Sequence, residues 1–132
     1  MIVDRRPDRP RVLVVEDEAR VAALIEIILS EAGYAVVGPI ATVGRALETI
    51  EGGQVDAALL DVRVNGCQAY PVADALTARG IPFVFVSGFA QKEMPANYRR
   101  CAYLAKPFQP AAILASLDKM IGRVRRPPNR AR

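Results

Sequence analysis

Five polar groups of this sequence follow, or close, short apolar runs. They are Glu16 and Asp17 after residues 12–15, Asp61 after residues 57–60, Ser87 at the end of residues 83–87, and Lys106 after residues 101–105. A carboxylate at the end of a buried apolar run is costly unless a cation or a hydrogen-bond donor accompanies it. Asp61 is therefore either a helix cap or the centre of a site, and the other groups decide between these two interpretations.

Each of these residues has an ordinary structural role when it is taken alone. An acid such as Asp17 after a strand is often a helix N-cap. Ser87 before Gly88 is typical of a turn, and a single Lys106 is more often a solvated cation. Separate structural roles become a poor explanation if one fold brings all of these residues to the same place.

The chemistry that these groups offer follows from their charge. Neighbouring carboxylates repel each other and do not all stay ionised without a cation. Two carboxylates, a backbone carbonyl and retained waters suit Mg²⁺. In such a site the carboxylate of Asp61 acts as a nucleophile toward a phosphoryl group. The metal ion and Lys106 then neutralise the transferring charge, and Ser87 donates a hydrogen bond to a phosphoryl oxygen.

The apolar runs themselves predict five strands. Their ranges are 11–15, 34–37, 57–60, 82–87 and 101–105, and Gly38-Pro39 closes the second one. Runs that are short, apolar throughout and bounded by turn residues are typical of strands buried on both faces. The run that leads into Asp61 fits this description, since Gly52-Gly53 precedes it and Asn65-Gly66 follows it.

Helices are predicted between the strands from apolar residues at helical spacing. The inward stripes are Val21, Leu24, Ile25, Ile28 and Leu29; Val43, Ala46, Leu47 and Ile50; Val72, Ala75 and Leu76; and Ile113, Leu114, Leu117 and Ile121. Thr42 caps the second helix, Pro71 and Pro110 open the third and the last, and Gln109 is a poor cap. Glycines end the first three helices, at Gly33, Gly52-Gly53 and Gly80. Residues 89–100 have room only for a short helix.

Five strands that alternate with five helices predict a doubly wound parallel α/β sheet with right-handed crossovers. The expected strand order is 2-1-3-4-5, and ligands of such sheets bind outside the carboxyl ends of the strands, at the switch between strands one and three. This arrangement brings the five polar groups to one edge of the sheet. It therefore favours a site over separate structural roles.

Length and charge predict one domain with basic ends. The chain has 132 residues, 52% of them hydrophobic, which suits one domain with a sizeable core. We expect a basic arm at 1–10, a domain at 11–122 and a disordered Arg/Pro-rich tail at 123–132. Residues 1–11 hold four Arg and two Asp, and 123–132 hold five Arg, so nine basic and twelve acidic residues remain between them in a chain of +4. A specific nucleic-acid partner is not expected, since basic residues for that purpose would lie on a folded face.

Compartment and cysteine use are predicted from what the sequence lacks. No apolar run is long enough for a membrane span, and residues 1–11 lack the apolar core of a secretory signal, so we expect a cytoplasmic protein with no membrane partner. Cys67 and Cys101 match no metal spacing, and the chain has no His to assist them. We expect both to be reduced, structural thiols.

Over residues 11–122 the sequence resembles the receiver domain of bacterial two-component response regulators. The matching segments are Val12-Leu13-Val14-Val15-Glu16-Asp17-Glu18, Leu59-Leu60-Asp61-Val62, Val86-Ser87-Gly88 and Lys106-Pro107-Phe108. The resemblance implies a flavodoxin-like (βα)5 fold with Asp61 as the phosphoacceptor. It implies a signalling protein and not an enzyme, since such a domain catalyses only its own phosphorylation and slow autodephosphorylation.

The same resemblance assigns roles to the neighbours of Asp61. Glu16 and Asp17 form the acidic pocket that holds Mg²⁺ together with Asp61, and Arg63 lends its backbone carbonyl to the metal ion. Lys106 is the phosphate-sensing cation. The peptide bond between Lys106 and Pro107 is expected to be cis.

Three further residues are implied to control the switch. Ser87 is the switch hydroxyl and Tyr103 is the rotating aromatic residue. Arg63 and Phe89 flank the phosphoryl site and are implied to tune how long the phosphoryl group lasts, by gating the attacking water.

A narrower resemblance is to single-domain receivers of Alphaproteobacteria, which carry a Phe-Ala-Thr-Gly-x-Tyr segment. Here the segment reads Phe85-Val86-Ser87-Gly88-Phe89-Ala90, so the Tyr is absent. The stretches 70–76 and 80–83 also look like that group. The Pro that the family usually carries four residues after the phosphoacceptor is Asn65 in this chain, which we expect to loosen the loop.

These features lead to the hypothesis of a single-domain response regulator. A sensor histidine kinase or a histidine phosphotransferase supplies the phosphoryl group to Asp61, and Ser87 and Tyr103 rearrange in response. A downstream protein then binds the face made by residues 89–100, the strand 101–105 and the final helix. The protein is expected to be a monomer or a phosphorylation-dependent dimer.

Four alternatives stand beside this hypothesis. The first two are a phosphate sink or shuttle without an output surface, and a degenerate pseudo-receiver that serves as an interaction module. An aspartyl-phosphate hydrolase would carry a second acid at the position of Arg63. A flavodoxin-like electron carrier would carry a hydroxyl- and glycine-rich loop after the first strand, where Glu16, Asp17 and Glu18 would repel a phosphate.

Overall fold

The computed structural model describes residues 9–88 and 91–122 of the chain. Its centre is a parallel sheet of five strands in the order β2-β1-β3-β6-β7. The strands are β1 (Arg11–Val15), β2 (Ala35–Ile40), β3 (Ala57–Leu60), β6 (Phe83–Ser87) and β7 (Tyr103–Ala105). The predicted α/β class and the predicted order 2-1-3-4-5 are confirmed, because these strands are the first to fifth of the sheet in chain order.

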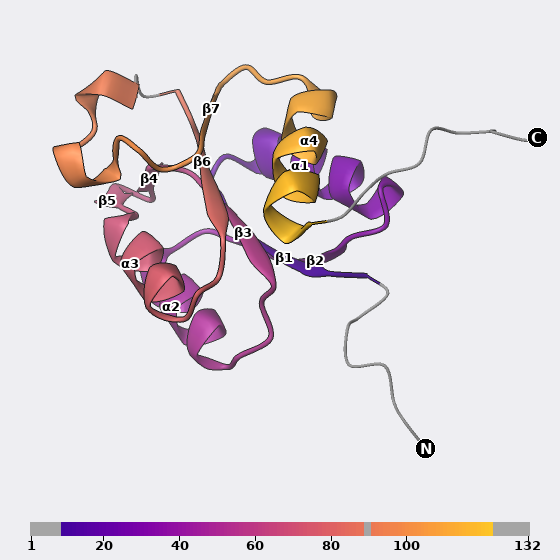
Figure 1. Cartoon of the computed structure of the whole chain (residues 1–132), viewed down its shortest axis with the longest axis horizontal. Coiled ribbons are helices and arrows are strands. Elements are labelled where there is room, and N and C mark those ends of the chain that lie inside the picture. The colour runs from indigo at the N-terminus through magenta and orange to yellow at the C-terminus, as the bar shows by residue number, and fades with distance from the viewer. Residues whose placement is uncertain (1–8, 89–90, 123–132) are drawn as a thin grey trace, which may run out of the picture.

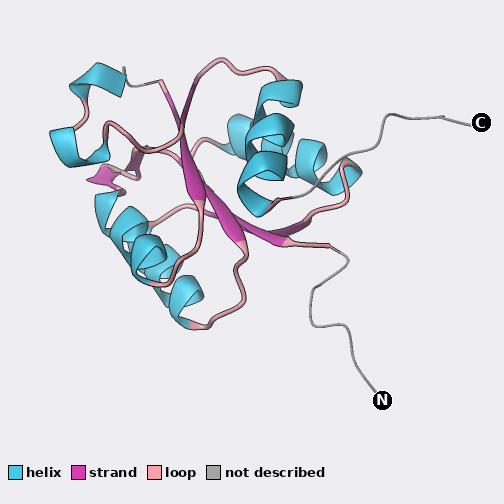
Figure 2. Cartoon of the chain, viewed as in Figure 1, coloured by secondary structure: helices cyan, strands magenta, loops and turns pink. Residues whose placement is uncertain are grey.

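Helices cover both faces of the sheet (Figures 1 and 2). On one side lie α1 (Ala19–Glu31) and α4 (Pro110–Ile121), and on the other lie α2 (Val43–Glu51) and α3 (Tyr70–Ala78). Alternate residues of each central strand face opposite layers: Leu13 and Leu60 belong to the core under α2 and α3, while Val14 and Leu59 belong to the core under α1 and α4. This period of two is the reason that the strand sequences are apolar throughout.

The helix ends follow the predicted local signals. The Thr42 side chain accepts a hydrogen bond from the Arg45 amide and caps α2, while Gln109 makes no side-chain cap at the start of α4. Gly33 and Gly80, with φ of 91° and 70°, follow the ends of α1 and α3. These positive φ values are the left-handed conformation that glycine adopts without strain after a helix.

Strand β2 is longer than predicted. Its range Ala35–Ile40 includes Gly38 and Pro39, which were expected to close the strand. The Gly38-Pro39 peptide is cis and Gly38 has a φ of 106°, and the pairing register with β1 shifts between Leu13 and Val15. The pair is therefore a local irregularity within an edge strand, a place where proline is tolerated in a sheet.

Two predicted helical features are wrong. Residues 91–100 form no α-helix, and the described part of that segment has only the 3₁₀ turns η1 (Gln91–Glu93) and η2 (Ala96–Tyr98). Pro95 separates the two turns and cannot donate a helical hydrogen bond. Leu24 was placed in the buried stripe of α1 but is 46% exposed, whereas its neighbour Ile25 is buried. Consecutive residues of a helix lie about 100° apart around its axis, so Leu24 is turned away from the sheet that Ile25 faces.

A hairpin that the sequence analysis did not predict follows β3. Its strands are β4 (Arg63–Val64) and β5 (Cys67–Gln68), joined by Asn65 and Gly66. Both turn residues have positive φ, 51° and 79°, as a two-residue type I′ turn requires. Asn65 therefore takes a defined position in this turn, and its effect on the mobility of the loop stays a prediction.

Two smaller expectations are also tested by the described residues. Cys67 and Cys101 were expected to be reduced, structural thiols, and both are free thiols. Cys67 is exposed and Cys101 is partly buried. None of the helices in the described ranges is long and apolar enough to cross a membrane.

Candidate functional site

Backbone hydrogen bonds fix the residues that leave the sheet at its carboxyl edge. The Glu16 amide donates to the Ile40 carbonyl at 2.9 Å and the Asp61 amide to the Val15 carbonyl at 3.0 Å. The Lys106 amide donates to the Ser87 carbonyl at 2.9 Å. Each of these three residues is thus held by the neighbouring strand, which sets the direction in which its side chain leaves the sheet.

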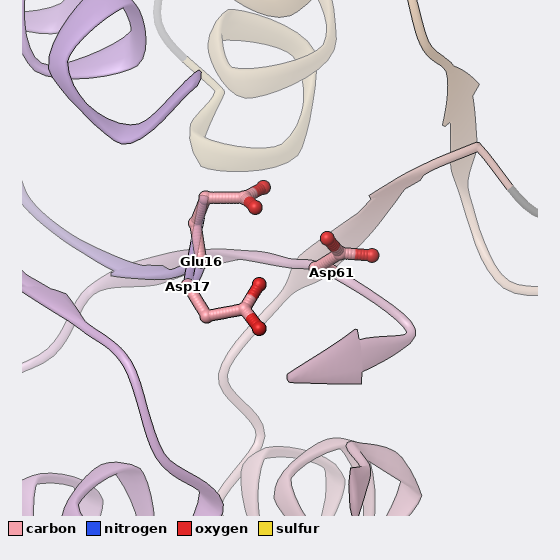
Figure 3. Close-up of side chains that lie close together, drawn as sticks. All are labelled: Glu16, Asp17 and Asp61. Carbon is pink, nitrogen blue, oxygen red and sulfur yellow. The ribbon is translucent and has the colours of Figure 1, made fainter. Parts of the chain in front are cut away.

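Three carboxylates meet at this edge (Figure 3). Glu16, Asp17 and Asp61 each offer one oxygen within 4.8 Å of the others. Glu16 is almost fully buried at 3% exposure, the Asp61 side chain is 12% exposed, and Asp17 is exposed. The cluster is therefore buried at one side and open to solvent at the other.

The Lys106 ammonium lies between two of the carboxylates. Its Nζ is 2.9 Å from Glu16 Oε1 and 2.9 Å from Asp61 Oδ2, with Glu18 Oε1 further away at 3.9 Å. The Lys106 side chain is only 17% exposed. Charge-assisted hydrogen bonds of this length are stronger than neutral ones, so Lys106 fixes the relative positions of Glu16 and Asp61.

The charges of the cluster shift the pKa values of its most buried members. Burial raises the pKa of Glu16; the hydrogen bond from Lys106 opposes this rise, and the charge of Asp61 adds to it. Burial alone would lower the pKa of Lys106, but its hydrogen bonds to Glu16 and Asp61 outweigh burial, and the pKa lies above its ordinary value. The hydrogen bonds of Lys106 to both carboxylates therefore favour its charged form, whereas burial of Glu16 disfavours the charged form of that carboxylate.

The hairpin β4–β5 closes the cluster from the side. The Arg63 amide donates to Asp61 Oδ1 at 3.5 Å, a long contact, and the Asn65 amide donates to Asp17 Oδ2 at 2.7 Å. Asn65 and Gly66 were expected to form a turn, but a hairpin and a contact of Asn65 with Asp17 were not predicted. The dipeptide Asn65-Gly66 was the available signal, since Asn-Gly is a strong indicator of a two-residue hairpin.

Two residues predicted to act as a switch lie beside the cluster. Ser87 is 3% exposed at the end of β6, and its carbonyl accepts a hydrogen bond from the Tyr103 hydroxyl at 3.2 Å. Burial raises the pKa of Tyr103, and the charges of Asp61 and Glu93 add to the rise. The Lys106-Pro107 peptide is cis, as predicted, and Phe89 lies outside the described residues.

The donor set of the cluster suits a hard divalent cation. All three ligand candidates are carboxylates, and oxygen-only sites of this kind prefer Mg²⁺ or Ca²⁺ to softer metals. One ammonium group serves two of the three carboxylates, so a second cation would relieve the remaining repulsion. The residues present therefore fit a magnesium ion with Asp61 at its side.

Comparison with protein families identifies one match. A family model described as "Response regulator receiver domain" matches residues 12–118. Similar curated proteins include the transcriptional regulatory protein PdtaR of Mycobacterium tuberculosis, 29% identical over 87% of this chain and 58% of PdtaR. The chemotaxis protein CheY of Thermotoga maritima is 28% identical over 83% of this chain and 96% of CheY. The chain spans about half the length of most of these curated relatives.

Solved structures give the same result. A solution structure of SdrG from Sphingomonas melonis is 36% identical, with a TM-score of 0.77 over 88% of this chain and 99% of that chain. A beryllofluoride-activated structure of SdrG is 38% identical, with a TM-score of 0.72 over 84% of this chain and 95% of that one. A CheY-like receiver from Methanospirillum hungatei is 25% identical, with a TM-score of 0.76 over 86% of this chain and 94% of that one.

Proposed function

Because this chain belongs to the response regulator receiver family, we propose that it accepts a phosphoryl group on Asp61 and thereby switches the binding of a partner protein. The observation that carries the proposal is the position of Lys106 Nζ, 2.9 Å from both Glu16 Oε1 and Asp61 Oδ2. A cation in that place neutralises charge on a group arriving at Asp61. In phosphoryl transfer, most of the catalysis consists of such positioning and neutralisation.

Asp61 is the nucleophile in this proposal. One of its carboxylate oxygens attacks the phosphorus of a phosphohistidine on the donor protein, so that a P–O bond forms. The P–N bond breaks, and its electron pair returns to the donor imidazole. Nearby Lys106 pairs with the phosphoryl oxygens, and the buried Ser87 at the end of β6 offers its hydroxyl to them. Water later attacks the acyl phosphate and regenerates the Asp61 carboxylate.

Glu16, Asp17, Asp61 and the backbone carbonyl of Arg63 would hold Mg²⁺. When bound, this ion supplies positive charge to the oxygens of the transferring group. The pairing of β4 with β5 supports the role of Arg63. Arg63 faces Gln68, and this pair lies between the pairs Val62–Ala69 and Val64–Cys67. In the first of these, the Ala69 amide donates a hydrogen bond to the Val62 carbonyl at 2.7 Å. In an antiparallel pair, such a residue directs its own N–H and C=O away from the partner strand, here to the side of Asp61.

The readout of phosphorylation is proposed to run through Ser87 and Tyr103. The Tyr103 hydroxyl is bonded to the Ser87 carbonyl, so a displacement of Ser87 toward a phosphoryl group at Asp61 changes that contact. A shift from 1:99 to 99:1 between two arrangements needs about 5.5 kcal/mol of differential stabilisation. Arg63 and Phe89 are proposed to set the lifetime of the phosphoryl group, and Phe89 lies outside the described residues.

The partners proposed are proteins of two kinds. A sensor histidine kinase or a histidine phosphotransferase supplies the phosphoryl group. A downstream protein reads the face formed by residues 89–100, β7 and α4. In Figure 1 the described part of this face, which is residues 91–100, β7 and α4, lies around the outer edge of the sheet. Phosphorylation-dependent dimerisation is the alternative use of that face, and a cytoplasmic location fits both.

The test uses beryllofluoride, which mimics a phosphoryl group on a carboxylate. Beryllofluoride with Mg²⁺ is expected to shift the amide NMR signals of β6 and β7 in the wild-type protein and to leave Asp61→Asn unchanged. The matched control is Asp56→Asn at the opposite end of β3, where the carboxylate accepts a hydrogen bond from the Arg11 amide at 2.7 Å. An Asp61→Asn protein that responds like the wild type would place the acceptor elsewhere.

A second use of the same chemistry is a phosphate sink or shuttle, in which Asp61 accepts and passes on a phosphoryl group without an output surface. The partly buried contact between Tyr103 and Ser87 favours a switch, because a sink has no need for an aromatic residue linked to the site. Phosphotransfer kinetics of Tyr103→Phe and Tyr103→Ala distinguish a switch from a sink. A sink transfers phosphoryl groups equally well in both variants and binds no partner in a phosphorylation-dependent way.

A further inference from the structure

The outward edge of β4 is a row of backbone groups that the hairpin does not use. Val64 pairs with Cys67, and the Ala69 amide donates to the Val62 carbonyl at 2.7 Å. These pairs use the backbone groups of residues 62 and 64 that face the partner strand. The amides of Arg63 and Asn65 alternate with them and point outward, toward the acidic cluster.

Two carboxylates of the cluster receive these outward amides. The Arg63 amide approaches Asp61 Oδ1 at 3.5 Å, and the Asn65 amide donates to Asp17 Oδ2 at 2.7 Å. We propose that the backbone amide of Asn65 positions the Asp17 carboxylate for the divalent cation. This inference rests on the proposed function of the site and makes Asn65 a positioning residue, since it acts through Asp17.

Asp17 differs from the other two carboxylates in how it is held. Glu16 and Asp61 are fixed by Lys106 Nζ at 2.9 Å each. Asp17 is exposed, and the ion pairs of Lys106 in the described residues are with Glu16, Glu18 and Asp61. The charge-assisted hydrogen bond from the Asn65 amide therefore holds Asp17, as Lys106 holds Glu16 and Asp61. It occupies one oxygen of Asp17 and leaves the other for a metal ion.

The conformation of the turn makes this contact possible. Asn65 has a φ of 51° and Gly66 a φ of 79°, and Asn tolerates this left-handed region better than most residues. Buried Val64, at 0% exposure, anchors the hairpin in the core under α3. The amide is thus presented by a fixed turn, and its position does not depend on the side chain of Asn65.

The first experiment compares two substitutions at this position. Asn65→Gly keeps the amide and the positive φ, whereas Asn65→Pro removes the N–H and cannot adopt a φ of 51°. Loss of a group that orients a metal ligand typically costs about 10- to 100-fold in metal affinity. We expect a loss of about tenfold in Mg²⁺ affinity by calorimetry for Asn65→Pro, and wild-type affinity for Asn65→Gly. Equal affinities for both variants, or tighter binding by Asn65→Pro, would overturn the proposal.

A second measurement avoids metal and does not rely on a proline variant that fails to fold. In Mg²⁺-free protein, the Asn65 amide is expected to exchange slowly with solvent, and Asp17→Ala is expected to accelerate this exchange at least about tenfold. The neighbouring Cys67 amide, which pairs within the hairpin, serves as the internal control and should not change. An Asn65 amide that exchanges at the same rate in both proteins would exclude the contact.

Failure of this inference is distinguishable from failure of the proposed function. At saturating Mg²⁺, Asn65→Pro is expected to respond to beryllofluoride with the same amide shifts in β6 and β7 as the wild type. A wild-type protein that shows no response contradicts the phosphoacceptor role of Asp61. The Mg²⁺ affinities and exchange rates still decide the role of Asn65 in that case.

Discussion

Lys106 links the two least exposed carboxylates of the site with a single positive charge. Its Nζ contacts Glu16 and Asp61 at 2.9 Å each, and its raised pKa keeps it charged. Asp17 stands outside this pairing and is held by the Asn65 amide instead. The metal-free site therefore has two carboxylates organised by a side chain and one by the backbone, with net negative charge left for a cation to balance.

The contribution of Lys106 to stability is open to a direct test. Lys106→Met leaves Glu16 and Asp61 without their cation, and we expect the free energy of unfolding at neutral pH in EDTA to fall by about 2 kcal/mol. Because the pKa of Lys106 is raised above 10.5, this stabilisation is present below that pH and is lost as the pH rises through the folded-state value. Urea denaturation of the wild type and Lys106→Met in EDTA, at neutral pH and at increasingly alkaline pH, measures both effects. Exposed Lys92→Met is the control, and an equal loss in the two variants would contradict the expectation.

Glu16 gives the site a dependence on pH in the acid range. Its pKa is raised chiefly by burial, so a proton competes with Mg²⁺ at a higher pH than it would at an ordinary carboxylate. We expect the affinity for Mg²⁺, measured by calorimetry, to fall as the pH is lowered from about 7 to about 5. Glu16→Gln cannot take up this proton and should bind Mg²⁺ more weakly but with a flatter pH dependence. A variant with the slope of the wild type would assign the proton to another group.

The side chains of the site were predictable from sequence, and its backbone contacts were not. Asp61 and Lys106 follow apolar strands, and a parallel sheet brings the ends of such strands together. The Asn65 amide that holds Asp17 has no such signature, because every residue except proline carries an N–H group. Only the turn type reveals where that group points, and the sequence predicted a turn at Asn65-Gly66 without its hairpin or its type.

At the scale of elements, strand β2 includes the residues that were predicted to end it. Gly38 and Pro39 are turn residues by composition, but β2 runs through them to Ile40. The sheet can include them because β2 is an edge strand, and because Gly38 adopts a φ of 106° that other residues rarely reach. Composition alone could not reveal this, since it reports local preference and not the neighbouring strand that overrides it.

Gly38 is therefore expected to be intolerant of a side chain. A Cβ at this position would lie 2.7 Å from the Ile40 amide nitrogen, and the positive φ adds strain, so Gly38→Ala should destabilise the fold by about 1–3 kcal/mol. Gly44→Ala is the matched control, because it lies in α2 with open space around its Cα and should stabilise the helix by about 0.5–1 kcal/mol. Chemical denaturation of the two variants measures both changes, and a neutral Gly38→Ala would show that β2 relaxes at this point.

The segment after β6 is the element in which helical prediction failed most clearly. Two 3₁₀ turns stand there in place of an α-helix, and side chains fix them to the layer below. Met94 is 1% exposed within the core under α2 and α3. Tyr98 stacks on Tyr70 with ring centroids 4.4 Å apart and donates a hydrogen bond to Asp74 at 2.8 Å. These contacts with α3 connect residues far apart in the chain, so no local sequence pattern predicts them.

At the scale of the whole molecule, the sheet separates two cores and the site lies at the edge where both end. Tyr103, Met94 and Tyr98 belong to the core under α2 and α3, while α1 and α4 enclose the other. Under the proposed function, Tyr103 is the residue through which a change at Asp61 would reach the 3₁₀ segment on this side of the sheet. On the other side, Tyr34 donates a hydrogen bond to Asp118 of α4 and connects β2 to the final helix.

The charge of the molecule is divided between its domain and its ends. Residues 123–132 carry five arginines and no acid, which exceeds the net charge of +4 of the whole chain. Attraction of such a segment to a polyanion is electrostatic and sequence-independent, so it weakens as salt is added. We expect a protein limited to residues 9–122 to elute from heparin at lower salt than the full chain. Its thermal unfolding and its beryllofluoride response should be unchanged, since the described helices, strands and acidic cluster are all retained.

A full-length variant separates the charge of the ends from their length. Its five C-terminal arginines are replaced by glutamine, at Arg123, Arg125, Arg126, Arg130 and Arg132. If charge alone is responsible, this variant should elute from heparin close to the truncated protein, because both lack the five C-terminal arginines and share the acidic domain. Residues 1–8, which the truncation also removes, hold two Arg and two Asp and so add no net side-chain charge. Retention equal to that of the full chain would assign polyanion binding to the domain itself. A reduced beryllofluoride response in either variant would instead connect the basic ends to the proposed function of the acidic cluster.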